Sequence, residues 1–205
     1  MKAVIFDFDG TIADSLLGVL AVLGHYKQEL PLTTKEVNGF RNKSFYRIAR
    51  ECKVPFYKLV WLALFGRRAF RNHLDKVHVY TGIPDLLRSL HQKGVQCYIV
   101  SMNRAETIHD FLRINGLEQY VRAVYGKAWI FDKSGKMKQI LHQEDIRPDE
   151  ACAVGDEIID IVSARRAGLR IQSVTWGYTA RKALQLLNPD GLHDTVESLE
   201  KELLT

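Results

Sequence analysis

The chain alternates short apolar runs with amphipathic stretches from about residue 83 onward, and this alternation restricts the fold more than any other feature. The apolar runs, which are typical of buried strands, cover residues 95–101, 123–125, 151–155 and 171–175. The helical patterns that separate them lie at 83–90, 105–115, within 135–143 and at 158–167. Strands separated by helices usually pair in parallel, because a parallel connection needs a long crossover. We therefore predict an α/β class, with a Rossmann-like three-layer core and a mostly parallel sheet.

Residues 15–78 have a different character. Apolar residues recur there at spacings of three and four, beginning with Leu16, Leu17 and Leu20, and no stretch alternates as a strand does. This segment directly follows the first apolar run, residues 3–6. We predict that residues 15–78 form a small all-helical cap domain inserted after the first strand. Residues 1–14 and 79–205 then form the α/β core domain.

The first apolar run ends in Asp7 and Asp9. Side chains alternate along a strand, so both carboxylates point to the same side. At about 4 Å and an effective dielectric of about 20, their repulsion is about 4 kcal/mol. A calcium loop of the EF-hand type would need a ligand at its fifth position and Gly at its sixth, but Gly10 occupies the fourth. We therefore favour a cation site or proton chemistry over an EF-hand or a plain surface turn.

Polar side chains also follow the other predicted strands. Ser101 and Asn103 follow one strand, while Asp156, Glu157 and Asp160 follow another, and Lys133 lies in the predicted loop before the helix at 135–143. Because the carboxyl ends of parallel strands meet at one edge of a sheet, these groups should converge there. Carboxylates with a hydroxyl and an ammonium are what a phosphoryl group and a divalent cation require.

Four motifs follow one another along the chain: D-x-D-G-T, an apolar strand that ends in Ser, a Lys, and G-D-x-x-x-D. This order resembles the haloacid dehalogenase superfamily of phosphohydrolases, and the motifs cover essentially the whole chain. The helical insertion resembles that family's cap of the first type. The resemblance implies that Asp7 is the nucleophile, which forms an aspartyl-phosphate, and that Asp9 is the general acid and base. It also implies that Mg²⁺ is held by the carboxylates of Asp7 and Asp156 and by the backbone carbonyl of Asp9.

The resemblance further assigns phosphate binding to Thr11, Ser101, Asn103 and Lys133. Lys136 and Lys138 compete with Lys133 because this stretch is rich in lysine. Ser101 also suits the cap of the following helix. Glu157 and Asp160 are expected around the metal or the lysine, although acids in a first helical turn are favourable in any case. Trp176 and Tyr178, which follow the last strong strand, either edge the cleft or pack.

These assignments predict a Mg²⁺-dependent phosphatase that acts on a small phosphorylated metabolite, in the phosphoglycolate phosphatase-like branch. Members of the superfamily that displace halide lack a carboxylate at the position of Asp9. A sugar-phosphate mutase and a non-catalytic binding or regulatory protein on the same fold remain alternatives. Arg41, Lys43 and Arg47, in the predicted cap, are candidates for substrate selection.

Composition narrows the partners and the compartment. The chain has 205 residues and a net charge of +5, which is spread along the sequence, so nucleic acid is not an expected partner. Cys52, Cys97 and Cys152 lie far apart and fit neither a disulfide framework nor a zinc site, which favours a reducing cytoplasm. The most apolar stretch, 59–65, is too short to span a bilayer, so no membrane partner is expected. The sequence names neither the substrate nor the oligomeric state.

Overall fold

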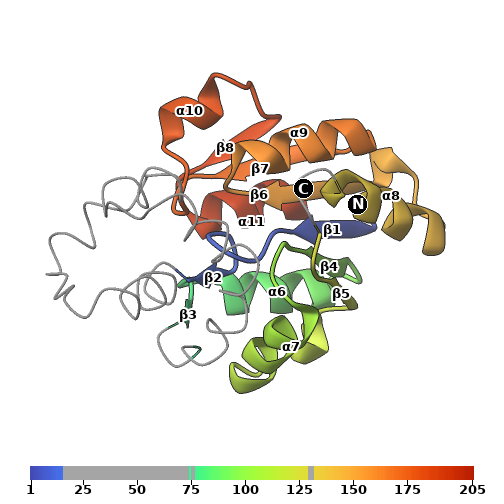
Figure 1. The fold of residues 1–205 in the computed structure, drawn as a ribbon, viewed down its shortest axis with the longest axis vertical. Helices are drawn as coiled ribbons and strands as arrows, with labels where there is room; N and C mark the ends of the chain where they lie inside the picture. Colours follow the sequence, from blue (N-terminus) through green and yellow to red (C-terminus); the bar gives the residue numbers. More distant parts are fainter. Residues whose placement is uncertain (16–73, 75–76, 129–131) are drawn as a thin grey trace, which may run out of the picture.

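The strand that carries Asp7 lies inside a six-stranded sheet in which all neighbours are parallel, in the order β5-β4-β1-β6-β7-β8 (Figure 1). The computed structural model describes residues 1–15, 74, 77–128 and 132–205. The strands of the sheet are β1 (Ala3–Phe6), β4 (Gln96–Val100), β5 (Ala123–Tyr125), β6 (Ala151–Gly155), β7 (Arg170–Val174) and β8 (Gly191–His193). The predicted α/β class with a mostly parallel sheet is confirmed.

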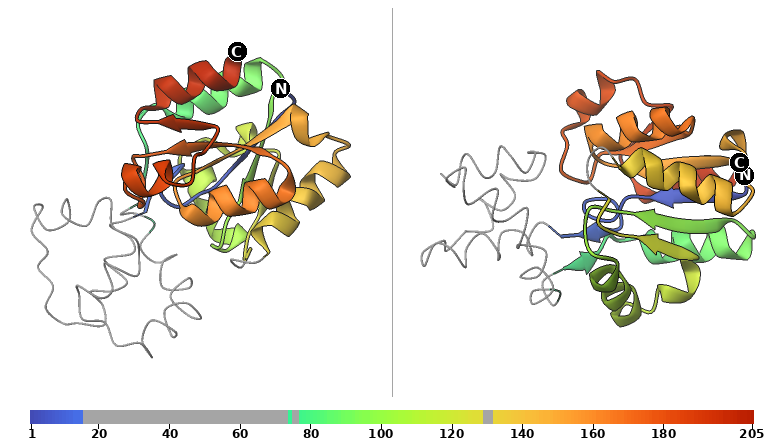
Figure 2. Two further views of the ribbon diagram at one scale, coloured as in Figure 1. Left: turned by 90° about the horizontal axis from the view of Figure 1, so that it is seen from above. Right: turned by 45° about the vertical axis from the view of Figure 1, so that its right-hand side comes forward.

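Helices cover both faces of this sheet, which makes three layers (Figure 2). The helices are α6 (Ile83–Gln92), α7 (Ala105–Ile114), α8 (Lys133–Gln143), α9 (Ile158–Ala167), α10 (Arg181–Gln185) and α11 (Val196–Leu204). Two 3₁₀ turns, η3 (Glu118–Tyr120) and η4 (Pro148–Glu150), join elements of the core. Helices α6, α7 and α11 share one apolar cluster with the sheet, and α8, α9 and α10 share the other.

The alternation of side chains along β1 explains both clusters. Val4 and Phe6 belong to the cluster with α6, α7 and α11, whereas Ala3 and Ile5 belong to the cluster with α8 and α9. All four side chains are at most 1% exposed, as expected for a central parallel strand. By the same alternation, Asp7 follows Ile5 onto the side where α8 and α9 lie. The fold therefore directs the first carboxylate toward these two helices.

A second, two-stranded sheet lies where the predicted insertion begins and ends. Strands β2 (Ala13–Asp14) and β3 (His78–Val79) pair antiparallel, with Asp14 opposite His78. The amide of Tyr80 also donates to the carbonyl of Ile12 at 3.1 Å. The chain thus leaves and re-enters the core at neighbouring points. Almost all of the predicted cap, including Arg41, Lys43, Arg47 and Cys52, lies outside the described residues, so the domain division stays a prediction.

Most predicted elements match the structure closely, and a few are missing or displaced. β5, β6 and α9 have the predicted bounds, and β4 and β7 differ by about a residue at their ends. Helix α8 begins at Lys133, so our placement of Lys133 in a loop before the helix is wrong. Strand β8, helix α11 and the β2–β3 pair were not predicted. None of the helices in the described part of the chain combines the length and apolar character needed to cross a membrane.

Candidate active site

The loop after β1 folds back tightly on itself. The carbonyl of Phe8 accepts hydrogen bonds from the amides of Ile12 and Ala13 at 3.0 and 2.9 Å, and the amide of Gly10 donates to the carbonyl of Ala13 at 2.9 Å. Gly10 has a φ of 84°, which side chains other than glycine rarely adopt. A Cβ at Gly10 would also overlap the carboxylate of Asp156. Glycine at this position therefore allows both the turn and the close approach of the loop to Asp156, which follows β6.

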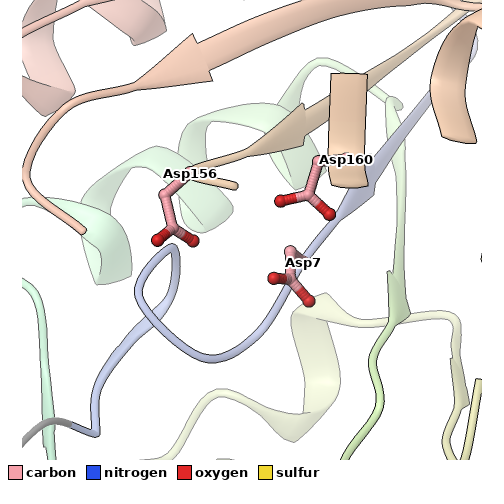
Figure 3. A group of neighbouring side chains, drawn as sticks. All are labelled: Asp7, Asp156 and Asp160. Carbon is pink, nitrogen blue, oxygen red and sulfur yellow. The ribbon is translucent and has the colours of Figure 1, made fainter. Parts of the chain in front are cut away.

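Asp7, at the end of β1, meets the side chains of helices α8 and α9. Figure 3 shows its carboxylate close to Asp160, with Asp156 on the neighbouring segment. Lys133 Nζ lies 2.8 Å from Asp7 Oδ1 and 2.5 Å from Asp160 Oδ1. The side chains of Lys133 and Asp160 are each 2% exposed and that of Asp7 is 7% exposed. One ammonium thus bridges two carboxylates in a buried triad.

Burial and neighbouring charges shift the titration of this triad strongly. Burial raises the pKa of Asp7 to about 8, although the ammonium of Lys133 opposes the rise. Burial alone would lower the pKa of Lys133, but the carboxylates of Asp160 and Asp7 outweigh it and hold that pKa above its usual value. Lys133 is therefore a permanent cation, and Asp7 needs positive charge nearby to stay ionised.

Asp156 is fully buried and held by two hydrogen bonds. It accepts hydrogen bonds from the hydroxyl of Thr11 at 2.9 Å and from the backbone N–H of Tyr178 at 2.7 Å. A Cβ at Gly177 would overlap its carboxylate, as one at Gly10 would. Burial, together with the carboxylates of Glu157, Asp7 and Asp160, raises the pKa of Asp156 well above its usual value. Thr11, which was predicted to bind phosphate, donates its hydroxyl hydrogen to Asp156 in this structure.

Ser101 and Asn103, which follow β4, lie on the other side of the loop after β1. Both are buried, and the amide of Asn103 donates to Ser101 Oγ at 3.0 Å. Asn103 Nδ2 reaches Asp9 Oδ2 at 3.4 Å. Burial raises the pKa of Asp9, and hydrogen bonds from Ser15 and Asn103 oppose the rise. The structure thus brings the strand end at Asn103 to the second carboxylate of the D-x-D pair.

The other predicted site residues differ in whether they lie near the acidic cluster. Lys136 Nζ lies 4.0 Å from Asp132 on the outside of α8, and Lys138 is exposed, so of the three lysines only Lys133 reaches the acidic cluster. Glu157 immediately precedes α9, and its amide donates to Asp160 Oδ2 at 2.9 Å. Burial raises the pKa of Glu157 to about 7.

A divalent cation fits the donor set. Oxygens of Asp7, Asp156 and Asp160 lie within 4.8 Å of one another. The carboxylates of Asp9 and Glu157 act electrostatically on Asp7 and Asp156, while Lys133 supplies the one cation that contacts the cluster among the described residues. A surplus of buried carboxylates is stabilised when a hard cation with oxygen ligands binds between them.

Four residues that make contacts in the site region were not predicted from the sequence or had their role left open there: Ser15, Tyr80, Trp176 and Tyr178. Ser15 and Tyr80 carried no signal, since neither belongs to a recognised motif. Trp176 and Tyr178 have only one sequence signal, which is that they follow the last strong strand. In the structure Trp176 Nε1 donates to the carbonyl of Thr11 at 3.2 Å, and the hydroxyl of Tyr80 donates to the carbonyl of Trp176 at 3.2 Å. Applying the strand-end rule to β7 would have found the Trp176 segment.

The fold and these side chains together define a Rossmann-like α/β enzyme with an aspartate-rich centre at the carboxyl edge of its sheet. The family model described as haloacid dehalogenase-like hydrolase matches residues 4–174, and the chain belongs to this family. The phosphoglycolate phosphatase of Synechococcus elongatus is 30% identical over 202 residues, which span 97% of this chain and 95% of the relative. The predicted enzyme class, a hydrolase of the phosphatase type, is thereby confirmed.

Solved structures share the fold. A haloacid dehalogenase-like hydrolase from Streptococcus pneumoniae superposes with a TM-score of 0.78 at 22% identity, covering 97% of each chain. A haloacid dehalogenase family hydrolase from Deinococcus radiodurans, solved with bound phosphate and sodium, has a TM-score of 0.72 at 21% identity, and the match covers 99% of this chain and 95% of that chain. These likenesses support the architecture described above.

Proposed function

We propose that the protein hydrolyses a small phosphate monoester and that Asp7 takes up the phosphoryl group as an aspartyl-phosphate. The observation that carries the proposal is the buried triad in which Lys133 bridges Asp7 and Asp160. A buried nucleophilic carboxylate beside a permanent ammonium suits attack on a phosphoryl group, because the ammonium offsets the negative charge that both partners bring.

The residues around Asp7 have separate proposed roles in phosphoryl transfer. Lys133, held on its other side by Asp160, stays beside the phosphoryl oxygens during transfer and neutralises their charge. Asp9 gives a proton to the leaving oxygen and later takes one from the attacking water. Ser101 and Asn103 lie on the β4 side of the same loop, where a hydroxyl and an amide N–H are available to phosphoryl oxygens. Phosphate binding by Thr11 would require its hydroxyl to leave Asp156.

We assign the cation to Mg²⁺, held by Asp7, by the backbone carbonyl of Asp9 and by Asp156. Asp160 suits this role less, because Lys133 and the amide of Glu157 occupy its two oxygens. When bound, Mg²⁺ would polarise the phosphoryl group and screen the carboxylates. Asp160 and Glu157 then act by holding Lys133 and the start of α9.

The names of the relatives support the proposed substrate class. Relatives from Synechococcus elongatus and Aquifex aeolicus are named phosphoglycolate phosphatases, at 30% and 26% identity. We therefore place this chain in a phosphoglycolate phosphatase-like branch that acts on a small phosphorylated metabolite in the cytoplasm.

Phosphate release by the purified protein tests the proposal. We expect turnover of 2-phosphoglycolate and of an aryl phosphate with Mg²⁺, and none with EDTA. Asp7→Asn should abolish turnover while its circular dichroism spectrum stays that of the folded wild type. Equal rates in Mg²⁺ and EDTA, or retained activity in Asp7→Asn, would contradict the mechanism. A matched control is Asp85→Asn, which changes an aspartate on α6 that pairs with Arg88 at the surface.

A further inference from the structure

The segment that follows β7 contacts the loop after β1 and Asp156 at the same time. Trp176 Nε1 donates to the carbonyl of Thr11 at 3.2 Å, and the backbone N–H of Tyr178 donates to Asp156 Oδ2 at 2.7 Å. The phenol oxygen of Tyr178 lies 2.6 Å from Ser15 Oγ. Residues 176–178 therefore hold the loop after β1 and the carboxylate of Asp156 in a fixed relation to each other.

Thr11 holds the same carboxylate through its other oxygen. The hydroxyl of Thr11 donates to Asp156 Oδ1 at 2.9 Å, and both residues are 0% exposed. Each oxygen of Asp156 thus accepts one hydrogen bond, which fixes the direction of the carboxylate and leaves each oxygen able to accept once more. Figure 3 shows this carboxylate at the tip of the loop after β1, where a Cβ at Gly10 would overlap it.

The hydroxyl of Thr11 cannot serve Asp156 and a phosphoryl group at once. A threonine hydroxyl has a single hydrogen to donate, and the oxygens of a carboxylate and of an ionised phosphate only accept. In the structure that hydrogen goes to Asp156. The two roles of Thr11 are therefore alternatives, and the geometry favours the one on Asp156.

The donors that hold Asp156 are neutral, unlike the donor that holds the other two carboxylates of the cluster. Lys133 contacts Asp7 and Asp160 with its ammonium. A hydroxyl and a backbone N–H orient Asp156 without neutralising its charge, so this charge stays available to a cation. Carboxylates that bind metal ions are commonly hydrogen-bonded in this way by neighbouring groups.

We propose that Thr11 is a positioning residue for Asp156 rather than a phosphate ligand: its hydroxyl fixes the direction of the carboxylate, and Trp176 holds Thr11 in place. The inference rests on the proposed function, in which Asp156 holds Mg²⁺. Thr11 acts through Asp156 and does not contact the reacting atoms. Because this role belongs to cation binding, it can be measured without substrate.

Calorimetric titration of Mg²⁺ into the purified protein, without substrate, tests this role. Thr11→Val keeps the shape of the side chain and removes the hydroxyl. We expect the Kd for Mg²⁺ to rise about tenfold, at the lower end of the range of about 10–100-fold for groups that hold a metal ligand. The inhibition constant of inorganic phosphate at saturating Mg²⁺ should stay close to that of the wild type. Thr11→Ser, which keeps the hydroxyl, should retain the wild-type Kd.

Two variants of the segment after β7 complete the test. Thr175→Val is the matched control, because Thr175 Oγ1 donates to Asp194 Oδ1 at 2.7 Å in an exposed pair of the same kind, and it should leave the Kd for Mg²⁺ unchanged. Trp176→Phe removes the indole N–H that donates to the carbonyl of Thr11. It should raise the Kd for Mg²⁺, but by less than Thr11→Val. If Thr11→Val does not fold, the Kd of Trp176→Phe decides.

Several results would overturn the inference. A raised inhibition constant for phosphate with an unchanged Kd for Mg²⁺ would assign Thr11 to phosphate, and equal rises in both constants would show a general distortion of the site. A loss in Thr11→Ser or Thr175→Val as large as in Thr11→Val would show that the hydroxyl on Asp156 is not the cause. A wild type that neither binds Mg²⁺ nor releases phosphate would remove the proposed function and this inference with it. A wild type that does both, with unchanged Mg²⁺ binding in Thr11→Val, removes only this inference.

Discussion

Replacing Lys133 by Met tests how much the buried triad contributes to stability. The variant keeps a long unbranched side chain but removes the ammonium that lies 2.8 Å from Asp7 and 2.5 Å from Asp160. At 2% exposure Lys133 is a buried partner, and removing one partner of a buried pair costs about 3–5 kcal/mol because the other charge is left uncompensated. For a chain of 205 residues, about 2–4 °C per kcal/mol gives a fall in Tm of about 6–20 °C.

Thermal unfolding in EDTA at pH 7.5, followed by circular dichroism, measures this difference without added metal. Lys136→Met is the matched control on the same helix. Its ammonium lies 4.0 Å from Asp132 with side chains 32% and 53% exposed, and such surface pairs contribute about 0–1 kcal/mol. The reasoning is refuted if Lys133→Met unfolds within about 2 °C of the wild type, at about 2–4 °C per kcal/mol, or if Lys136→Met loses as much.

Three further outcomes are expected. Asp156→Asn should remove the rise in Tm that Mg²⁺ gives the wild type and lower phosphatase activity at least about tenfold; an unchanged response to Mg²⁺ in thermal-shift titrations would exclude Asp156 as a ligand. Burial lowers the pKa of His193 below 6.5, so the unfolded chain takes up this proton first and the contribution of His193 to stability should fall as the pH drops below about 6.5; the difference in unfolding free energy between the wild type and His193→Gln, measured in urea, should therefore change in this direction from pH 7.5 to 5, and a difference that stays constant would contradict the shift. Phe111, 1% exposed and edge-on to Phe8 at 5.1 Å between centroids, should cost about 3–5 kcal/mol on replacement by Ala, and a cost below about 1 kcal/mol would contradict its place in the core.

Local sequence patterns were sufficient to locate the centre of the site. Strands β1, β4 and β6 are neighbours in the sheet, so the residues that follow them, among them Asp7, Ser101 and Asp156, meet at one edge. That outcome follows from the parallel pairing that strand–helix alternation requires. The bounds of β6 and α9 were predictable because an apolar run and a helical period each define them.

Weak or very short elements were not predictable. Strands β2 and β3 have two residues each and depend on being brought together by the core. Helix α8 starts at Lys133, two residues before the Gly135 that we took as part of its beginning. The Lys133 side chain is held by Asp7 and Asp160, and such tertiary contacts override local helix propensity.

By itself, the sequence determined the fold class, the family and the strand ends where the candidate site lies, because side-chain periodicity and motif order are local properties. Only the tertiary structure decided which of three lysines meets Asp7, that Thr11 and Tyr178 hold Asp156, and that Tyr178 reaches Ser15. These contacts join residues up to 163 positions apart. Their geometry depends on how the helices and loops pack against the sheet, which no local pattern encodes.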